Sequence, residues 1–277
     1  MTRRDFTLRT EDSVALTASL WEAKNPKGVL LWLHGYAEHR LRYEHLGAWT
    51  AERGLSLVSI DFRGHGDSGG RRGYIKKFQD YFYDVDALLE YCRNELGEPE
   101  PVLGAHSNGA LIAIRYHQEH PEIKFKTAVF SSPYLGLKMK VPAWKNALGK
   151  ALGALYPRLS LSNDIPPEFI VKDPEALKIY KADRRQLPNV TAGYHRGAVL
   201  NQKLAQEGAP SFTLPLLLML SKEDPFTDPD PMRSFYEHIG SGAKRLVEYE
   251  NKHHEILQEP GREELYETIY DWIRGRL

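Results

Sequence analysis

Short apolar runs without polar interruptions recur along this chain, and they constrain its fold more than any other feature. Residues in these runs do not alternate between polar and apolar, which is typical of strands buried on both faces of a parallel sheet. Between the runs, apolar residues recur three or four positions apart, as on one face of an amphipathic helix. This order predicts βαβ units in a mostly parallel sheet with helices on both faces. The predicted strands cover residues 29–33, 55–60, 102–105, 127–130, 216–220 and 245–249, and the predicted helices cover residues 78–96, 110–120 and 262–273.

Two further stretches complete the expected organisation. Residues 1–20 alternate roughly around the turn residues at 11–13 and predict a β-hairpin. Residues 133–210 contain helical patches and frequent prolines but no predicted strand, and they are too long for a plain connection. We therefore expect a core formed by residues 1–132 and 211–277, with residues 133–210 inserted as a helical cap.

The composition of the chain excludes several classes of protein. Among 277 residues, 37 basic residues balance 37 acidic residues, so the concentrated basic surface that binds nucleic acid is not expected. The single cysteine, Cys92, has no partner for an intramolecular disulfide or a thiolate zinc site. No apolar run approaches the ~20 residues of a membrane span, and no apolar stretch follows the charged start of the chain. We expect a soluble, cytoplasmic protein.

The residues that carry chemistry surround Ser107, which lies between a predicted strand and a predicted helix. A serine on the strained turn of such a junction needs small residues two positions away on either side, here Ala105 and Gly109. Its hydroxyl becomes a nucleophile only when a base takes the proton and an acid orients that base. Asp224 and then His254 follow later predicted strands, which is the order serine, acid and histidine of a hydrolase fold.

A fourth element follows the first buried strand, where the chain reads His-Gly-Tyr-Ala-Glu-His at residues 34–39. An acyl-transfer enzyme stabilises the developing oxyanion with preplaced donors, commonly two backbone N–H groups. One such group comes from the residue after the nucleophile, Asn108. The second comes from the loop after this strand, and Tyr36 is the expected donor.

Together, these segments resemble the monoacylglycerol lipase and lysophospholipase group of serine α/β-hydrolases. The resemblance covers both core segments, whereas the cap matches only in length and position. It implies an α/β-hydrolase fold with Ser107 as nucleophile, Asp224 as acid and His254 as base. The implied oxyanion donors are the backbone N–H groups of Tyr36 and Asn108. The matching residues lie at positions 34–39, 61–69, 106–109, 131–133, around 224 and at 249–255.

Three residues depart from the pattern of that group. Ala105 replaces the commoner Gly, Asn108 stands where Met is usual, and Ser221 replaces the Gly that often precedes the acid by three positions. None of these changes removes a catalytic group. Because Asn108 contributes its backbone, we expect its side chain to affect the substrate pocket rather than the chemistry.

The sequence predicts a serine hydrolase that cleaves carboxylic esters of lipid-like alcohols, with no metal or organic cofactor. A general carboxylesterase and an aminopeptidase or amidase of the same fold stay open as alternatives. An aminopeptidase needs an acidic anchor for the free amine of its substrate, for which Glu168 and Asp173 are candidates. A non-catalytic binding protein of this fold is disfavoured, because such proteins typically lose the serine or the histidine. The oligomeric state is left open.

The predicted cap contains one basic amphipathic segment, residues 141–156. Trp144, Leu148, Leu152 and Leu155 fall on one face at helical spacing, and lysines surround that face. The first three are candidate substrate-binding residues. Two interpretations stay open: the face contacts a lipid surface peripherally and lets an acyl chain reach Ser107, or it packs down as a lid over the acyl pocket.

One glycine-rich motif matches the sequence pattern of a dinucleotide-binding site. Residues 64–69 satisfy the pattern G-x-G-x-x-G, but that motif must open a helix whose N-terminus meets the pyrophosphate. Here the loop continues, and no helical pattern begins before about residue 77. The resemblance instead implies that Asp61, Arg63 and Asp67 tie neighbouring loops together.

Two histidines have a spacing that also occurs in metal sites. His117 and His120 lie one helical turn apart, as metal ligands can. No segment rich in carboxylates accompanies them, so we expect a solvated helix face.

Overall fold

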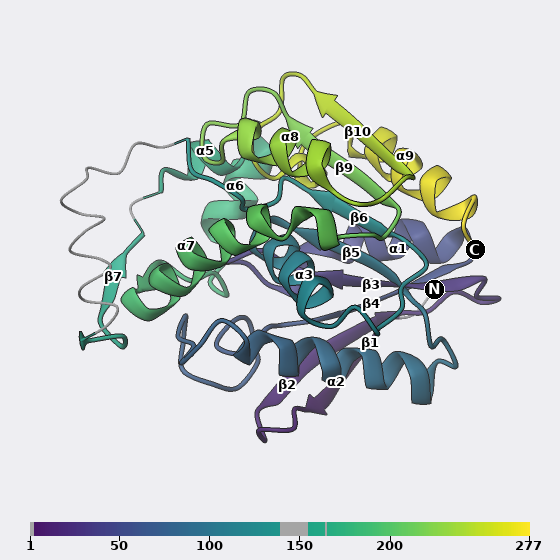
Figure 1. Cartoon of the computed structure of the whole chain (residues 1–277), viewed down its shortest axis with the longest axis horizontal. Helices are drawn as coiled ribbons and strands as arrows, with labels where there is room; N and C mark the ends of the chain where they lie inside the picture. Colours follow the sequence, from purple (N-terminus) through teal and green to yellow (C-terminus); the bar gives the residue numbers. More distant parts are fainter. Residues whose placement is uncertain (1–2, 139–154, 164) are drawn as a thin grey trace.

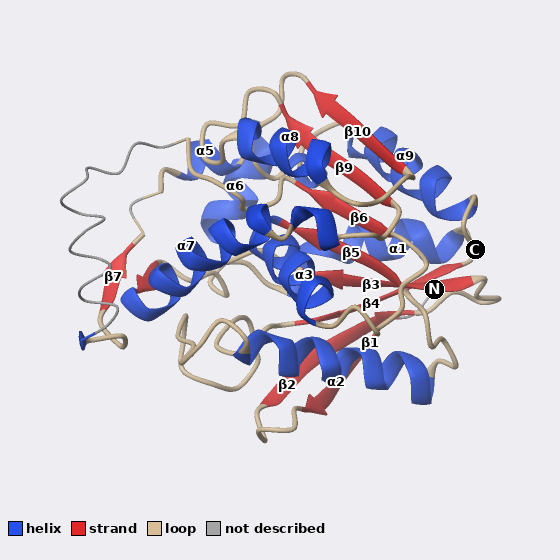
Figure 2. Ribbon diagram, viewed as in Figure 1, coloured by secondary structure: helices blue, strands red, loops and turns tan. Residues whose placement is uncertain are grey.

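The computed structural model describes residues 3–138, 155–163 and 165–277, and their centre is an eight-stranded sheet (Figures 1 and 2). The strand order is β1-β2-β4-β3-β5-β6-β9-β10, and every neighbouring pair from β4 to β10 is parallel. The expected mostly parallel α/β sheet is therefore confirmed. The strands are β1 Arg3–Arg9, β2 Ala15–Trp21, β3 Gly28–Leu33, β4 Leu55–Ile60, β5 Val102–His106, β6 Ala128–Ser131, β9 Leu216–Ser221 and β10 Lys244–Tyr249.

The N-terminal strands form the antiparallel edge of this sheet. β1 and β2 pair as the hairpin expected from the sequence, with Arg3 opposite Trp21. β2 then pairs antiparallel with β4, which joins the hairpin to the parallel strands. Side chains of β1, at the edge of the sheet, are mostly exposed, whereas β3 and β4 are buried along their whole length.

Helices cover both faces of the sheet, which explains why the central strands show no polar alternation (Figure 2). Leu31 and Leu33 of β3 belong to one core cluster together with α2, α3, α7 and α8. Leu30 and Trp32 belong to a second cluster with α1 and α9. Successive side chains thus enter two different apolar layers. These helices are α1 Glu44–Glu52, α2 Asp80–Glu95, α3 Ser107–Glu119, α7 Ala192–Glu207, α8 Pro229–His238 and α9 Arg262–Arg274.

The segment between β6 and β9 contains the expected helices and also a strand pair that was not expected. β7 and β8 form a separate two-stranded antiparallel sheet, with Ser160 opposite Thr191. Three residues in each strand are too few to produce an alternating pattern, which is why no strand was predicted in this segment. The division of the chain at residues 133 and 210 stays a prediction. The remaining elements of the segment are β7 Ser160–Ser162, α5 Pro167–Ile170, α6 Pro174–Ala182, β8 Asn189–Thr191 and the 3-10 helix η2 Ala209–Ser211.

Helix α7 packs directly on α3 instead of standing apart from the core (Figure 1). Arg115 Nε donates to Asn201 Oδ1 at 3.1 Å, and Gln118 Nε2 donates to the Ala205 carbonyl at 3.0 Å. Tyr194 and Ala205 of α7 lie in the same apolar cluster as α3. The helix that begins at Ser107 is thereby fixed against the segment predicted as the cap.

The strand order places the functional loops together. All parallel strands end at the same edge of the sheet, and β4 and β5 lie on opposite sides of β3. Ligands of open α/β sheets bind at such a reversal of strand order, beyond the carboxyl ends of the strands. The loops after β3, β5, β9 and β10 all begin at this edge.

Candidate active site

Ser107 lies at the junction of β5 and α3, where β5 ends at His106. Its backbone φ of +50° lies in the left-handed region, which is uncommon for a residue with a side chain and marks a strained turn. A Cβ at Gly109 would lie 2.4 Å from the Leu33 carbonyl oxygen, so only glycine lets α3 approach β3 this closely. Ala105 is completely buried in β5. The strand, sharp turn and helix predicted around Ser107 are confirmed.

A continuous chain of hydrogen bonds joins the three residues that the sequence singled out. His254 Nε2 lies 2.8 Å from Ser107 Oγ, and His254 Nδ1 lies 2.7 Å from Asp224 Oδ2. Ser107 follows β5 directly as the first residue of α3, and Asp224 and His254 lie in the loops after β9 and β10. All three are buried, and Ser107 is 6% exposed. The structure therefore brings Ser107, Asp224 and His254 together, although 147 residues separate the serine from the histidine.

The carboxylate of Asp224 is held by the loop in which it lies. Its Oδ1 accepts hydrogen bonds from the N–H groups of Phe226 and Thr227 at 2.8 and 2.9 Å. Its Oδ2 accepts from the Thr227 hydroxyl as well as from His254. Burial alone would raise the pKa of Asp224, but His254 and the bonds from Thr227 outweigh it and lower the pKa. Asp224 is therefore ionised at neutral pH and fixes the orientation of the His254 ring.

Thr227 is a part of this site that sequence reasoning missed. Its hydroxyl lies 3.2 Å from His254 Nδ1 while it donates to Asp224, so it contacts both residues. The available signal was the spacing of Asp224 and Thr227, because an aspartate commonly bonds backbone groups two or three residues later.

The loop after β3 lies directly against Ser107. A Cβ at Gly35 would lie 3.1 Å from the Ser107 Cβ, so glycine permits this close approach. Tyr36 follows Gly35, and Asn108 is the second residue of α3. The first N–H groups of a helix have no acceptor within the helix and carry its positive dipole end. Of the two residues expected to donate to an oxyanion, Asn108 thus follows Ser107 in the chain, and Tyr36 follows Gly35, which lies against Ser107.

A buried cluster of charges supports this loop, and nothing in the sequence pattern indicated it. The Gly35 N–H and the Tyr43 hydroxyl both donate to Glu38, and Arg42 pairs with Glu255, the residue after His254. Burial raises the pKa of Glu38, and the nearby Glu255 raises it further, while Arg42 lowers it. The cluster links the loop after β3 to the loop that carries His254. Arg42 and Glu255 are 213 residues apart in the chain, so no local pattern connects them.

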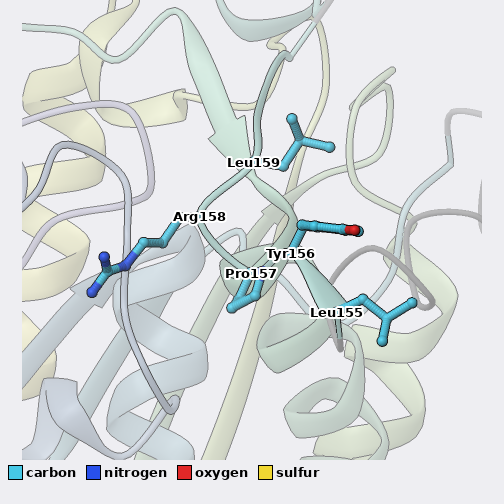
Figure 3. A pocket seen from close by; sticks show the side chains of 5 residues that line it. All are labelled: Leu155, Tyr156, Pro157, Arg158 and Leu159. Carbon is cyan, nitrogen blue, oxygen red and sulfur yellow. The ribbon is translucent and has the colours of Figure 1, made fainter.

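The candidate substrate-binding residues Trp144, Leu148 and Leu152 lie outside the described residues. Leu155, the fourth member of the predicted apolar face, is 74% exposed, and its neighbour Tyr156 is 65% exposed. Figure 3 shows a pocket at this point, with Arg158 extending away from Leu155 and Tyr156. The described end of the predicted face is therefore at the surface and does not pack on the core.

The interpretation of residues 64–69 as a structural loop is confirmed. The next helix, α2, begins only at Asp80, so the glycines do not open a helix. Arg63 pairs with Asp12 at 2.7 Å and with Asp84 at 2.8 Å, which ties this loop to the hairpin and to α2. Asp61 and Asp67 both pair with one arginine of the loop after β3, Arg40.

The expectation of a solvated helix face for His117 and His120 was wrong in part. His120 is partly exposed, but His117 is buried, and its ring centroid lies 5.1 Å from that of Phe212. The chain folds back after η2 and places Phe212 on this face of α3, a contact that the helical pattern could not indicate.

Within the described ranges, no three His, Cys, Asp or Glu side chains cluster closely enough to hold a metal ion. None of the described helices is both long and apolar enough to span a membrane.

The fold and the hydrogen-bonded serine, histidine and aspartate define the class of this protein, a serine hydrolase of the α/β-hydrolase fold. The family described as serine aminopeptidase, S33, matches residues 24–261, and the chain belongs to this family. The expected resemblance to the monoacylglycerol lipase and lysophospholipase group is confirmed by the relatives and the solved structure below.

Two curated relatives and one solved structure cover nearly the whole chain. The chain is 29% identical to a monoacylglycerol lipase of Mycolicibacterium smegmatis, over 100% of this chain and 99% of the relative. It is 27% identical to phospholipase YtpA of Bacillus subtilis, over 90% of this chain and 95% of the relative. The crystal structure of Paleococcus ferrophilus monoacylglycerol lipase superposes with a TM-score of 0.86 at 30% identity, covering 95% of this chain and 99% of that one. The chain also aligns with 30% of the length of an uncharacterized abhydrolase domain-containing protein of Dictyostelium discoideum, at 30% identity.

Proposed function

We propose that this protein hydrolyses carboxylic esters of lipid-like alcohols, with monoacylglycerols or lysophospholipids as substrates. The observation that carries the proposal is the unbroken hydrogen-bond chain from Ser107 Oγ through His254 to Asp224. The relatives named monoacylglycerol lipase and phospholipase support the substrate class.

Ser107 is the nucleophile of the proposed reaction. Its Oγ attacks the acyl carbonyl carbon while His254 Nε2 takes the hydroxyl proton. When the tetrahedral intermediate collapses, His254 returns that proton to the departing alcohol oxygen, and an acyl-serine ester is left. A water molecule then loses a proton to His254 and attacks the acyl-serine. Collapse releases the carboxylic acid, and the proton returns to Ser107 Oγ.

The surroundings of the triad supply the electrostatics of these steps. Asp224 stays ionised because its pKa is lowered, so it keeps the proton of His254 on Nδ1 and stabilises the imidazolium that forms. The backbone N–H groups of Tyr36 and Asn108 are the proposed donors to the oxyanion. Burial also lowers the pKa of the neighbouring His106, so this ring stays neutral beside the imidazolium of His254.

The two carboxylates that could anchor the free amine of a peptide substrate already have other partners. This observation favours an esterase over an aminopeptidase. Glu168 is exposed and pairs with Lys181 Nζ at 2.6 Å. Asp173 is the N-cap of α6 and accepts from the Ala176 N–H at 2.9 Å. Both carboxylates are thus engaged in local structure. A general carboxylesterase remains the second candidate, since the triad itself does not select acyl chain length.

The proposed reaction is tested by labelling with a fluorophosphonate probe and by hydrolysis of a substrate panel. The panel contains short nitrophenyl esters, monoacylglycerols, lysophospholipids and aminoacyl amides. We expect wild-type protein to be labelled and to prefer the lipid esters, and we expect Ser107→Ala to lose both labelling and about three orders of magnitude of turnover. More than about a tenth of the activity in Ser107→Ala would overturn the role of Ser107. Faster hydrolysis of aminoacyl amides would overturn the substrate class.

We also propose that the predicted cap meets a lipid surface at Leu155 and Tyr156. Leu155 and Tyr156 expose large apolar side chains that a lipid surface can bury, and the neighbouring Arg158 can pair with anionic headgroups. The cytoplasmic location expected from the sequence stays a prediction alongside this contact.

Co-sedimentation with anionic vesicles tests the surface contact. We expect the double variant Leu155→Ser, Tyr156→Ser to lose vesicle binding and to keep turnover of a short soluble ester. Leu277→Ser is the matched control, because this exposed leucine lies at the C-terminus, at the opposite end of the molecule from β7 (Figure 1). Wild-type protein that does not bind the vesicles would show that no such contact exists.

A further inference from the structure

One tyrosine of α7 contacts both residues that are proposed to hold the oxyanion. The Tyr194 hydroxyl donates to Asn108 Oδ1 at 3.0 Å. The Tyr194 ring stacks on the Tyr36 ring, with 3.8 Å between the centroids and 20° between the planes. Tyr194 and Asn108 are both buried. Tyr36 lies in the loop after β3 and Asn108 lies in α3, so Tyr194 is a physical connection between two separate elements of the core.

The Tyr36 side chain is held at its other end as well. Its hydroxyl donates to the carbonyl oxygen of Asn189, in β8, at 3.0 Å. The His65 ring meets the Tyr36 ring nearly at a right angle, with 5.1 Å between the centroids. With Tyr194 on one face, Tyr36 is confined on several sides, and the backbone of the loop after Gly35 is confined with it. Two of these three contacts come from the segment between β6 and β9.

Asn108 is constrained through its side chain while its backbone N–H is the proposed donor. It follows the strained Ser107 within the first turn of α3, so a change in its side-chain position is transmitted to the backbone next to the nucleophile. The Tyr194 hydroxyl gives its side-chain oxygen a partner in a buried position.

We propose that Tyr194 is a positioning residue that sets the two oxyanion N–H groups in place by holding Asn108 and Tyr36 together. This inference rests on the proposed function, because it assigns a role only if Tyr36 and Asn108 stabilise an oxyanion. An oxyanion forms in the transition state and not in the bound ester, so Tyr194 acts on kcat and leaves KM nearly unchanged. Docking of α7 on α3 thereby completes the oxyanion site.

Two substitutions separate the contacts of Tyr194. Tyr194→Phe removes the hydrogen bond to Asn108 and keeps the stacked ring, and we expect kcat to fall about tenfold. Tyr194→Leu removes both contacts, and we expect a fall of about a hundredfold. KM for a short soluble ester is expected to change less than threefold in either variant. Asn108→Leu keeps the backbone N–H, and combining it with Tyr194→Phe should add little further loss, because both changes break the same bond.

Tyr116→Phe is the matched control for a general loss of structure. Like Tyr194→Phe, it removes the hydroxyl of a buried tyrosine that donates a hydrogen bond. Tyr116 lies in α3 itself, and its hydroxyl donates to Asp86 at 2.5 Å. We expect this variant to keep wild-type kcat. The direct readout is the inhibition constant of a trifluoromethyl ketone, which forms a tetrahedral oxyanion on the serine. It should weaken in Tyr194→Phe by the same factor as kcat/KM.

Three results would overturn the role of Tyr194. Tyr194→Phe with kcat within twofold of wild type would show that the hydrogen bond does not matter. A loss confined to KM would make Tyr194 a substrate contact instead. An equal loss in Tyr116→Phe would make the effect structural. Failure of the proposed function is distinguishable, since it appears as missing fluorophosphonate labelling of the wild type or as activity in Ser107→Ala.

Discussion

At the scale of single residues, the two adjacent histidines after β10 show how position alone separates their roles. His254 is buried and bonds to Ser107 and Asp224. His253 is half-buried and points elsewhere, with Nδ1 2.5 Å from the Glu168 carbonyl oxygen. We expect His254→Ala to lower kcat by at least three orders of magnitude and His253→Ala to lower it less than about threefold. Steady-state kinetics on a short ester measures both. The reverse ranking would contradict the assignment of the base.

Two aspartates in the loop after β9 give a second comparison. Asp224 orients His254, whereas the Asp228 side chain caps α8 by accepting from the Asp230 N–H at 3.1 Å. Asparagine caps a helix as well as aspartate does, but it carries no charge to stabilise an imidazolium. We therefore expect Asp224→Asn to lower kcat by about two to four orders of magnitude and Asp228→Asn to leave kcat and Tm nearly unchanged. A larger loss in Asp228→Asn would move the acid to that residue.

At the scale of elements, the approach of α3 to β3 decides whether the site can form. A Cβ at Gly109 would lie 2.4 Å from the Leu33 carbonyl oxygen and 2.5 Å from that of His34. Both atoms belong to the backbone, so Gly109→Ala must displace α3 or the end of β3. We expect Gly109→Ala to lower the free energy of unfolding by about 1–3 kcal/mol and to reduce kcat as well.

Urea unfolding and ester hydrolysis together measure the effect of Gly109→Ala. Gly275→Ala is the control, because the nearest atom to its added Cβ is the Asp271 carbonyl oxygen at 4.0 Å and its φ of −74° suits alanine. That variant should unfold like wild type or be slightly more stable. A Gly109→Ala protein with unchanged stability and kcat would show that α3 is not fixed at this distance.

At the scale of the whole molecule, charged contacts join the segment between β6 and β9 to the core loops. Asp183, directly after α6, bonds to His39 Nε2 at 2.6 Å. Arg185 Nε lies 3.4 Å from Asp67 Oδ1, and the Leu187 N–H donates to the Ala37 carbonyl at 3.1 Å. Asp67 lies in the loop after β4, whereas two of these contacts, at His39 and at Ala37, are made by the loop that carries Tyr36. The position of this loop therefore depends on the segment predicted as the cap as well as on the core.

Buried histidines make the stability of the whole molecule dependent on pH. Burial lowers the pKa of His65 from 6.5 to about 3, and it lowers that of His34 to about 3 as well. Below pH 6.5 the unfolded chain binds protons on these rings and the folded chain does not. The contribution of the neutral rings to the free energy of unfolding is therefore complete above pH 6.5 and is lost as the pH falls towards 3.

The variant His65→Phe isolates one of these rings. Between pH 7 and pH 5, we expect wild-type protein to lose roughly 2 kcal/mol more unfolding free energy than His65→Phe, from about 1.4 kcal/mol for each pH unit below 6.5. Urea unfolding at the two pH values measures this difference, and the exposed His238→Gln is the control that should follow wild type. Equal pH dependence in wild type and His65→Phe would contradict the neutral, buried state of His65.

Local pattern and chain order were enough to predict the central strands, the turn at Ser107 and the candidate triad. Uninterrupted apolar runs gave the central strands, and small residues around Ser107 gave the turn. The order of Ser107, Asp224 and His254 along the chain indicated the triad, because parallel strands end at one edge of a sheet. Helices α1 and α8 were not predicted, because each is short, at 9 and 10 residues, and has few apolar positions.

The distant side chains that support these residues could be identified only once the chain was folded. Tyr194 reaches Asn108 across 86 residues of chain, and Arg42 reaches Glu255 across 213. His117 is buried where Phe212, 95 residues later in the chain, packs against its ring. Hydrophobic periodicity reports whether a residue faces a core, but it does not report which element covers that residue. Hydrogen bonds and ring contacts between such elements depend on distances that only packing sets, and they leave no spacing in the sequence.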